Sequence, residues 1–389
     1  MNRFATRVRP GQASRAPVIV FFLLCAGAAE AGFDSQEVKV LQALFPEGRP
    51  GAGGLGQAYW DLGGGKAISE KNLALLRANF DGQGAKETFV AFSLLKKYDP
   101  GADNFLEASP RAALLLCGGA SCEVKAGPLK VSDEGVVRGV ETGQLKKGGD
   151  MIGLVVFDSG AAPIKTLVVA VSQQEESGDL TKAASILRDD PEDEDRVGEV
   201  RFLDIDADGL AELIYHGVRR KPIDAYNGEK GGVLAEVHHF DRASGTFSFT
   251  FRVQVSSVLK DKKDDTWTHG PLMMFDGDPK TAWCEGTKEY GISEYVRVDY
   301  SEKQDFTTVQ LLPGWALNAK TFLSHNQMKT FMIESASPKK FGYTFPESKR
   351  ELQPVELLRP INTDWVRMWI QEIFSARIDA TCISEFLLE

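Results

Sequence analysis

Three aspartates stand at alternate positions in the segment RFLDIDADGLAELIYHG, from Arg201 to Gly217, and Gly209 follows them. Like charges this close repel one another unless a cation lies between them. The pattern D-x-D-x-D-G-x-x-E offers only oxygen ligands, which suit a hard cation such as Ca²⁺. We therefore predict a structural calcium site, whose ligands are the carboxylates of Asp204, Asp206, Asp208 and Glu212 and the carbonyl oxygen of Leu210.

The residues in and around this loop also argue against two other types of metal site. No cysteine lies in this loop, and His216 falls beyond its last ligand position, so zinc is disfavoured. An EF-hand is excluded because the twelfth position from Asp204 is Tyr215 rather than Glu, and because both flanks look like strands. The segment resembles the strand–calcium loop–strand unit of FG-GAP and VCBS repeats. We find one good copy and expect a single hairpin rather than a propeller; a solvated acidic turn is the alternative.

The rest of the chain carries no recognisable catalytic arrangement. The motifs GxSxG, HExxH and HxH are absent. His238 and His239 are neighbours in a strand-like segment and should point to opposite faces, so they do not form a two-ligand metal site. We therefore predict no catalytic residue. The alternative from another class is a secreted hydrolase acting on polysaccharide, with a catalytic N-terminal domain and a C-terminal targeting domain.

The segment FDGDPKTAWCEG, Phe275 to Gly286, precedes YGISEYVRVDY, FTTVQLLPGW and a closing ATCISEFLLE. Together these segments resemble the discoidin, or coagulation-factor C-type, domain of the galactose-binding-like superfold. The closest variant is the domain from the translocation region of a bacterial NAD glycohydrolase. The resemblance implies a jelly-roll β-sandwich over the last third of the chain. It does not imply glycohydrolase activity, because it concerns the accessory domain only.

The resemblance also implies site residues. In this family a structural calcium is often held where the first loop meets the last strand, and Asp276, Thr281 and Glu385 match that pattern. The alternative is that Asp276 and Thr281 only satisfy backbone groups in the turn. Such domains bind glycans or other polar ligands through loops at one end of the sandwich. The candidate ligand-binding residues are Trp267, His269 and Trp315, although Trp315 could equally belong to the core.

The N-terminus has the features of a secretory signal peptide, which we assign to residues 1–31. Four arginines precede the apolar run Val18 to Ala29, and Ala29-Glu30-Ala31 has the spacing of a signal-peptidase site. A retained membrane anchor is the alternative. Removing four arginines and one glutamate lowers the formal net charge from -10 to -13. An acidic chain of this kind is a poor candidate for binding nucleic acid or an anionic membrane.

Export and the cysteine count lead to a prediction about disulfides. No second apolar run approaches membrane-spanning length, so no transmembrane span is expected after signal removal, and the protein is predicted to be periplasmic or extracellular in a bacterium. The four cysteines outside the signal then suggest two disulfides, with three possible connectivities. Their spacing favours Cys117–Cys122 as a local loop and Cys284–Cys382 as a long-range link. Free buried thiols are the alternative.

The coarse pattern of elements predicts a mostly β protein with some N-terminal helix. We expect one helix in Ser35–Phe45 and a second over Ile68–Phe80, capped by Ser69, whereas LGGGK looks like a loop. Short segments rich in Val, Phe, Leu and Ile follow and predict strands. The predicted domains are a β-rich domain at 32–260 with the calcium-loop hairpin, a charged linker at 261–265, and a discoidin-like domain at 266–389.

The sequence thus favours an exported, non-enzymatic binding protein that recognises a glycan or a cell-surface component. Besides the hydrolase, a structural envelope protein is a further alternative.

Overall fold

The computed structural model describes residues 32–52, 58–80, 86–96, 108–145, 151–160, 163–173, 177–189, 197–206, 208–218, 232–241, 243–260, 267–287 and 290–389. The predicted signal peptide at 1–31 and the predicted linker at 261–265 lie outside these residues. Within them the protein is mostly β, as the sequence predicted. No helix in the described part of the chain is long and apolar enough to cross a membrane.

The N-terminal layer is an antiparallel sheet with one helix packed on its face. In hydrogen-bonded order its strands are β1 (Arg49–Ala52), β2 (Ala58–Gly63), β3 (Lys66–Ser69), β5 (Glu87–Leu95), β6 (Ala108–Gly118) and β7 (Ser121–Lys130), and β4 (Leu73–Ala78) also pairs with β5. The predicted first helix is confirmed as α1 (Ser35–Leu44). The carboxylate of Asp34 caps it by accepting the N–H groups of Gln36 and Glu37. Its buried residues pack against Trp60 and Phe92.

The prediction of a second helix over Ile68–Phe80 is wrong. This segment contains the end of β3, a short 3₁₀ turn (Glu70–Asn72) and β4, and Ser69 makes no capping hydrogen bond. Leu73 and Leu75 pack towards α1, whereas Ala74 and Ala78 pack towards the next sheet. Both faces of β4 are therefore covered, and a strand covered on both faces shows no polar alternation to distinguish it from a helix. The LGGGK segment is the β2–β3 turn, as expected, with three consecutive glycines at positive φ.

The second sheet lies between two other layers. Its strands, in order, are β11 (Leu180–Asp189), β10 (Thr166–Gln173), β9 (Met151–Asp158) and β8 (Val136–Gln144). Val155 and Phe157 of β9 face the first sheet. Ile152 and Leu154 face the opposite way and pack with residues of the third sheet. The nearly uninterrupted apolar sequence of β9 follows from this burial on both faces.

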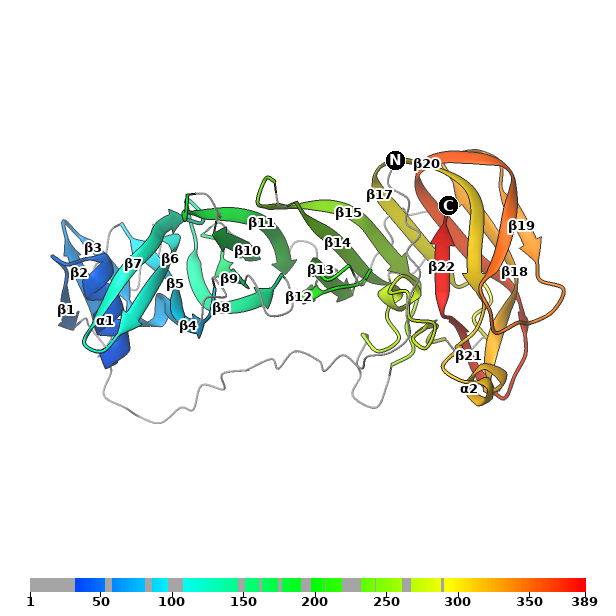
Figure 1. Ribbon diagram of the computed structural model, residues 1–389, viewed down its shortest axis with the longest axis horizontal. Coiled ribbons are helices and arrows are strands. Elements are labelled where there is room, and N and C mark those ends of the chain that lie inside the picture. The colour runs from blue at the N-terminus through cyan, green and yellow to red at the C-terminus, as the bar shows by residue number, and fades with distance from the viewer. Residues whose placement is uncertain are drawn as a thin grey trace.

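The third sheet runs without a break from the middle of the chain into the C-terminal domain. Its strands, in order, are β12 (Val197–Leu203), β13 (Glu212–Val218), β14 (Val233–Asp241), β15 (Thr246–Val255), β17 (Tyr295–Leu312), β20 (Gln353–Phe374), β18 (His325–Ser335), β21 (Ile378–Ile383) and β16 (Trp283–Cys284). Two further strands join it, since β19 (Phe341–Thr344) pairs with β18 and β22 (Glu385–Leu388) pairs with β17. Pairing of β15 with β17 links the two halves of this sheet. The layers follow one another along an elongated molecule, with α1 and the jelly roll at opposite ends (Figure 1).

The C-terminal jelly roll has its own apolar core and a disulfide at its edge. Buried residues from β14 to β22, Trp283 among them, form one hydrophobic cluster. Cys284 and Cys382 lie opposite each other on β16 and β21 and form a disulfide. The other predicted disulfide, Cys117–Cys122, closes the β6–β7 hairpin. Both predicted pairings are confirmed.

Candidate functional site

The loop that opens the jelly roll is built around Asp276. Gly277 has φ +66°, which its lack of a side chain permits, and the next residues close a tight turn. The hydroxyl of Thr281 donates to the Asp276 carboxylate at 2.8 Å. This bond satisfies part of the Asp276 carboxylate from within the loop, which is the geometry of the turn alternative, and a calcium ion at these two residues stays a prediction.

The hydrogen bonds of the turn do not account for a second carboxylate nearby, that of Glu385. Its side chain is 6% exposed, and its Oε1 atom has no hydrogen-bond partner among the described residues. Burial, with added repulsion from Asp276 and Asp278, raises the pKa of Glu385 to about 8. Burial likewise raises the pKa of Asp276 to about 6. A buried carboxylate oxygen without a donor, beside a second carboxylate, is a donor set that fits a hard cation.

Trp315 sits beside this pair of carboxylates. Its indole Nε1 donates to the carbonyl oxygen of Lys280, inside the Asp276 loop, at 2.8 Å. The next residue, Ala316, donates its N–H to the hydroxyl of Ser384, the neighbour of Glu385, at 3.0 Å. The indole is half-buried and packs against the Cys284–Cys382 disulfide. The position of Trp315 therefore depends on both segments that carry the carboxylates.

Two histidines hold the indole edge-on. The ring centroid of His269 lies 4.8 Å from that of Trp315, and the centroid of His325 lies 5.0 Å away. His269 donates through Nδ1 to the carbonyl oxygen of Ala282, and His325 donates through Nδ1 to that of Thr321. We call Trp315, His269 and His325 the Trp315 cluster. The sequence suggested His269 and Trp315 but not His325, because no local pattern brings residue 325 to this loop.

Trp267, the third predicted ligand-binding residue, lies elsewhere. Its ring stacks on His216 of β13 with centroids 4.1 Å apart. The guanidinium of Arg201 lies over the same ring at 4.3 Å. Trp267 therefore packs on the β12–β13 hairpin, and the structure does not bring it to the Trp315 cluster.

The predicted calcium loop connects β12 with β13, which pair from Leu203↔Glu212 onward. Oxygen atoms of Asp204, Asp206 and Asp208 lie within 4.8 Å of one another. Each of these carboxylates also accepts a backbone N–H from the loop, at 2.7–3.1 Å. Burial raises the pKa of Asp204, and the two neighbouring aspartates raise it further. An oxygen-only set of crowded carboxylates fits Ca²⁺ by the chemistry of its donors.

Glu212 and His239, which the sequence did not suggest as a ligand, form a second set with Asp206 that overlaps the first and adds a nitrogen donor. Glu212 is 3% exposed, and its Oε2 accepts the N–H of Ile205 at 2.8 Å. Burial, with repulsion from Asp206 and Asp204, raises the pKa of Glu212 to about 8. His239 of β14 places Nδ1 3.9 Å from Glu212 Oε1, and ligand atoms of Asp206, Glu212 and His239 lie within 4.8 Å of one another. Of the two neighbouring histidines, His239 is the one that lies with these acidic ligands.

The calcium loop also touches the second sheet. The N–H of Ala211 donates to the carbonyl oxygen of Leu145, just after β8, at 2.9 Å. The loop therefore lies at the junction of the second and third sheets.

Comparison with known proteins confirms the resemblance of the C-terminal domain. Residues 246–389 match the family model of the NAD glycohydrolase translocation F5/8 type C domain. The match begins at Thr246 and so includes β15 as well as the strands that follow it. A comparison with curated proteins finds no match.

Solved structures similar to this chain include three carbohydrate-binding modules. The family 32 module of C. perfringens NanJ, in complex with galactose, is 12% identical and covers 36% of this chain and 92% of its own, with a TM-score of 0.27. CpGH89CBM32-5 from Clostridium perfringens, in complex with GalNAc-β-1,3-galactose, is 11% identical and covers 36% and 94%, with a TM-score of 0.28. Chitosan-binding module 1 from a Paenibacillus sp. IK-5 chitosanase/glucanase is 13% identical and covers 35% and 92%, with a TM-score of 0.26.

Proposed function

Residues 246–389 form an F5/8 type C domain of the NAD glycohydrolase translocation type, and from this premise we propose that the protein is an exported, non-enzymatic binding protein whose jelly roll recognises a glycan or a cell-surface component. The Trp315 cluster carries the proposal. A half-exposed indole held at its N–H and at its edges offers an apolar face to the C–H face of a sugar ring.

The surroundings of Trp315 suit a polar ligand. Leu317, Asn318 and Lys320 follow it in the chain, and all three are exposed. The side chain of Asn318 caps the short helix α2 (Ala319–Ser324) by accepting the N–H of Thr321 at 2.9 Å. Because α2 and the Asp276 loop are both tied to their neighbours by hydrogen bonds, the surface around the indole is preorganised, which lowers the entropic cost of binding.

A calcium ion at Asp276 and Glu385 would support this surface without contacting the ligand. The indole N–H is held by the Asp276 loop, and Ala316 is held beside Glu385. A cation that neutralises the two carboxylates would keep these two segments together. Glycan binding by the protein is therefore expected to weaken when calcium is chelated.

Export is part of the same proposal. Two disulfides at separate sites are typical of proteins that fold in an oxidising compartment. Calcium is also more abundant outside the bacterial cytoplasm than within it, so both features suit a periplasmic or extracellular protein.

The experiment is a glycan array probed with the purified protein, once in calcium and once in EDTA. We expect binding to a restricted set of glycans, at least about tenfold weaker for Trp315→Ala. Trp365→Ala is the matched control, because Trp365 is half-buried in β20 beneath the Arg297 guanidinium, 4.7 Å from its ring centroid. Absence of binding to every glycan in both conditions, or equal losses in the two variants, would overturn the proposal.

A further inference from the structure

A small pocket lies at the end of the molecule opposite the jelly roll, between α1 and the first sheet. It has a volume of about 110 Å³ and is lined by Gln36, Lys39, Arg77, Cys117, Gly118, Gly119 and Ser121. Two positively charged side chains and no carboxylate belong to this lining, in a chain whose formal net charge is -10. The lining thus lacks the pair of carboxylates that glycoside hydrolysis requires.

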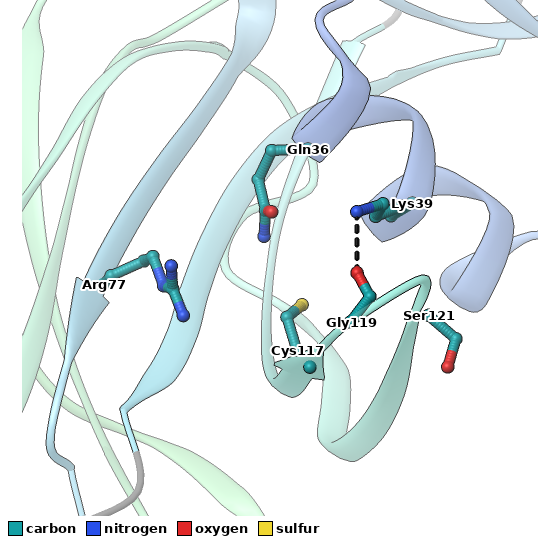
Figure 2. Close-up of a pocket in the computed structure, with 7 residues that line it drawn as sticks. Gln36, Lys39, Arg77, Cys117, Gly119 and Ser121 are labelled. Carbon is teal, nitrogen blue, oxygen red and sulfur yellow. Dashed lines mark hydrogen bonds between the residues drawn. The ribbon is translucent and has the colours of Figure 1, made fainter.

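The side chains that line the pocket come from three separate elements. Lys39 and Gln36 extend from α1, Arg77 extends from β4, and Cys117 lies on β6 between them, as Figure 2 shows. Lys39 and Gln36 are three residues apart and so share one face of the helix. Side-chain nitrogen atoms from α1 and from β4 therefore lie on two sides of the space above Cys117.

The hairpin turn below the pocket is held in place. The ammonium group of Lys39 donates to the carbonyl oxygen of Gly119 at 2.8 Å, which docks the helix on the turn (Figure 2). The Cys117–Cys122 disulfide closes the same turn. One bond uses one of the three ammonium hydrogens, so two remain for a ligand.

One buried donor of the lining has no hydrogen-bond partner among the described residues. The amide Nε2 of Gln36 is buried and makes no hydrogen bond. The exposed guanidinium of Arg77 makes no ion pair within the described part of the chain. Buried donors without acceptors are unfavourable, and an anion would relieve them.

The acidic residues nearest in sequence, Asp34 and Glu37, form no ion pair with Lys39 or Arg77 within the described part of the chain. Asp34 and Glu37 bond to each other's backbone in the capping box, where Glu37 Oε2 accepts the N–H of Asp34 at 2.7 Å. Asp34 also occupies the N–H groups at the start of α1, so the helix terminus is not available to a ligand. The positive charge of the pocket therefore comes from Lys39 and Arg77 alone.

We propose that this pocket binds a doubly charged tetrahedral oxyanion, a phosphate or sulfate group. Two cations balance a dianion better than a monoanion. Donors converge from α1 and from β4, and a tetrahedral group presents oxygens in both directions, whereas the acceptors of a carboxylate lie in one plane. Arginine in particular suits the geometry of such groups. The site does not depend on the glycan proposal, since it lies at the other end of the molecule.

The test is an NMR titration of the full ¹⁵N-labelled protein at constant ionic strength in a chloride background. The probes are inorganic phosphate, inorganic sulfate, methyl phosphate and acetate; methyl phosphate distinguishes an esterified group from the free ion. We expect saturable shifts of the Gly119 and Ser121 amides with phosphate or sulfate, and binding of acetate at least about tenfold weaker.

Variants then locate the binding. The double variant Lys39→Met, Arg77→Met should bind at least about tenfold more weakly, whereas Arg49→Met, Lys66→Met removes equal charge from the same sheet outside the pocket and should bind normally. Because Arg77 is exposed, Arg77→Met alone keeps the fold and should still weaken binding. No saturable shift with either dianion, acetate binding as tight as theirs, or unchanged binding in the pocket variants would overturn the proposal.

Discussion

Replacing Glu385 with glutamine removes one charge from the carboxylate pair of the jelly roll and should alter how stability depends on pH. In the metal-free protein, burial raises the pKa of Glu385 from 4.5 to about 8. Between about pH 4.5 and 8 the Glu385 carboxyl is therefore protonated in the folded protein and ionised in the unfolded chain. Stability falls as pH rises through this window, and the loss is complete above the folded pKa.

The size of the effect follows from the same shift. At about 1.4 kcal/mol for each pKa unit, ionising Glu385 in the folded metal-free protein at pH 8 costs on the order of 4 kcal/mol. Glutamine carries no charge at any of these pH values. From pH 5 to pH 8 in EDTA, Glu385→Gln should gain on the order of 3 kcal/mol relative to the wild type. In calcium at pH 8 the order should reverse, because the cation takes the place of the proton.

The assay is urea unfolding followed by tryptophan fluorescence, from pH 5 to pH 9, in EDTA and in calcium. Glu356→Gln is the control, because Glu356 is exposed on β20 of the same domain. The reasoning is refuted if the unfolding free energies of Glu385→Gln and the wild type change in parallel with pH in EDTA and calcium stabilises both proteins equally. That result would contradict both the buried carboxylate pair and its role as a cation site.

Three further predictions concern the stability of the protein. Calcium should raise the melting temperature of the protein over that in EDTA, and Asp206→Ala should lose the part of this gain that comes from the β12–β13 loop; equal gains in both proteins would contradict a metal there. Replacing both Cys284 and Cys382 with serine opens a link between residues 98 apart, which should cost about 4 to 5 kcal/mol of unfolding free energy in urea, and an unchanged midpoint would oppose this. Gly153→Ala would place a methyl 2.4 Å from the fully buried ring of Phe89, so we expect a loss of about 1–3 kcal/mol in the same assay, and wild-type stability would contradict the packing of the first two sheets.

The jelly roll could be predicted from the sequence because its signal is local and specific. The turn around Asp276, the nearby Cys284 and the closing strand with Cys382 and Glu385 each have a recognisable spacing. Several strands of the first two sheets, such as β5, β9 and β10, were also visible as short apolar segments. Their order was not, because pairing of β3 with β5 and the continuity of β15 with β17 depend on contacts that no local pattern encodes.

The candidate sites, too, could be predicted only where their residues lie close together in the sequence. The spacing of Asp204 to Glu212 predicts the acidic loop, but the approach of His239 depends on the pairing of β13 with β14. The pocket at Lys39 and Arg77 joins a helix and a strand that are separated in sequence, and neither residue has a motif around it. The wrong helix over Ile68–Phe80 has a related cause, since its apolar spacing reflects two covered faces of a strand.

The most direct test of the glycan proposal is the indole N–H signal of Trp315, assigned with Trp315→Phe and followed during titration with the glycan that binds most strongly on the array. The Trp315 N–H, bonded to the carbonyl oxygen of Lys280, should shift and saturate with the same dissociation constant that calorimetry measures, while the Trp267 signal stays in place. A Trp315 signal that does not move at saturation would contradict the assignment of the ligand to the loop end of the jelly roll.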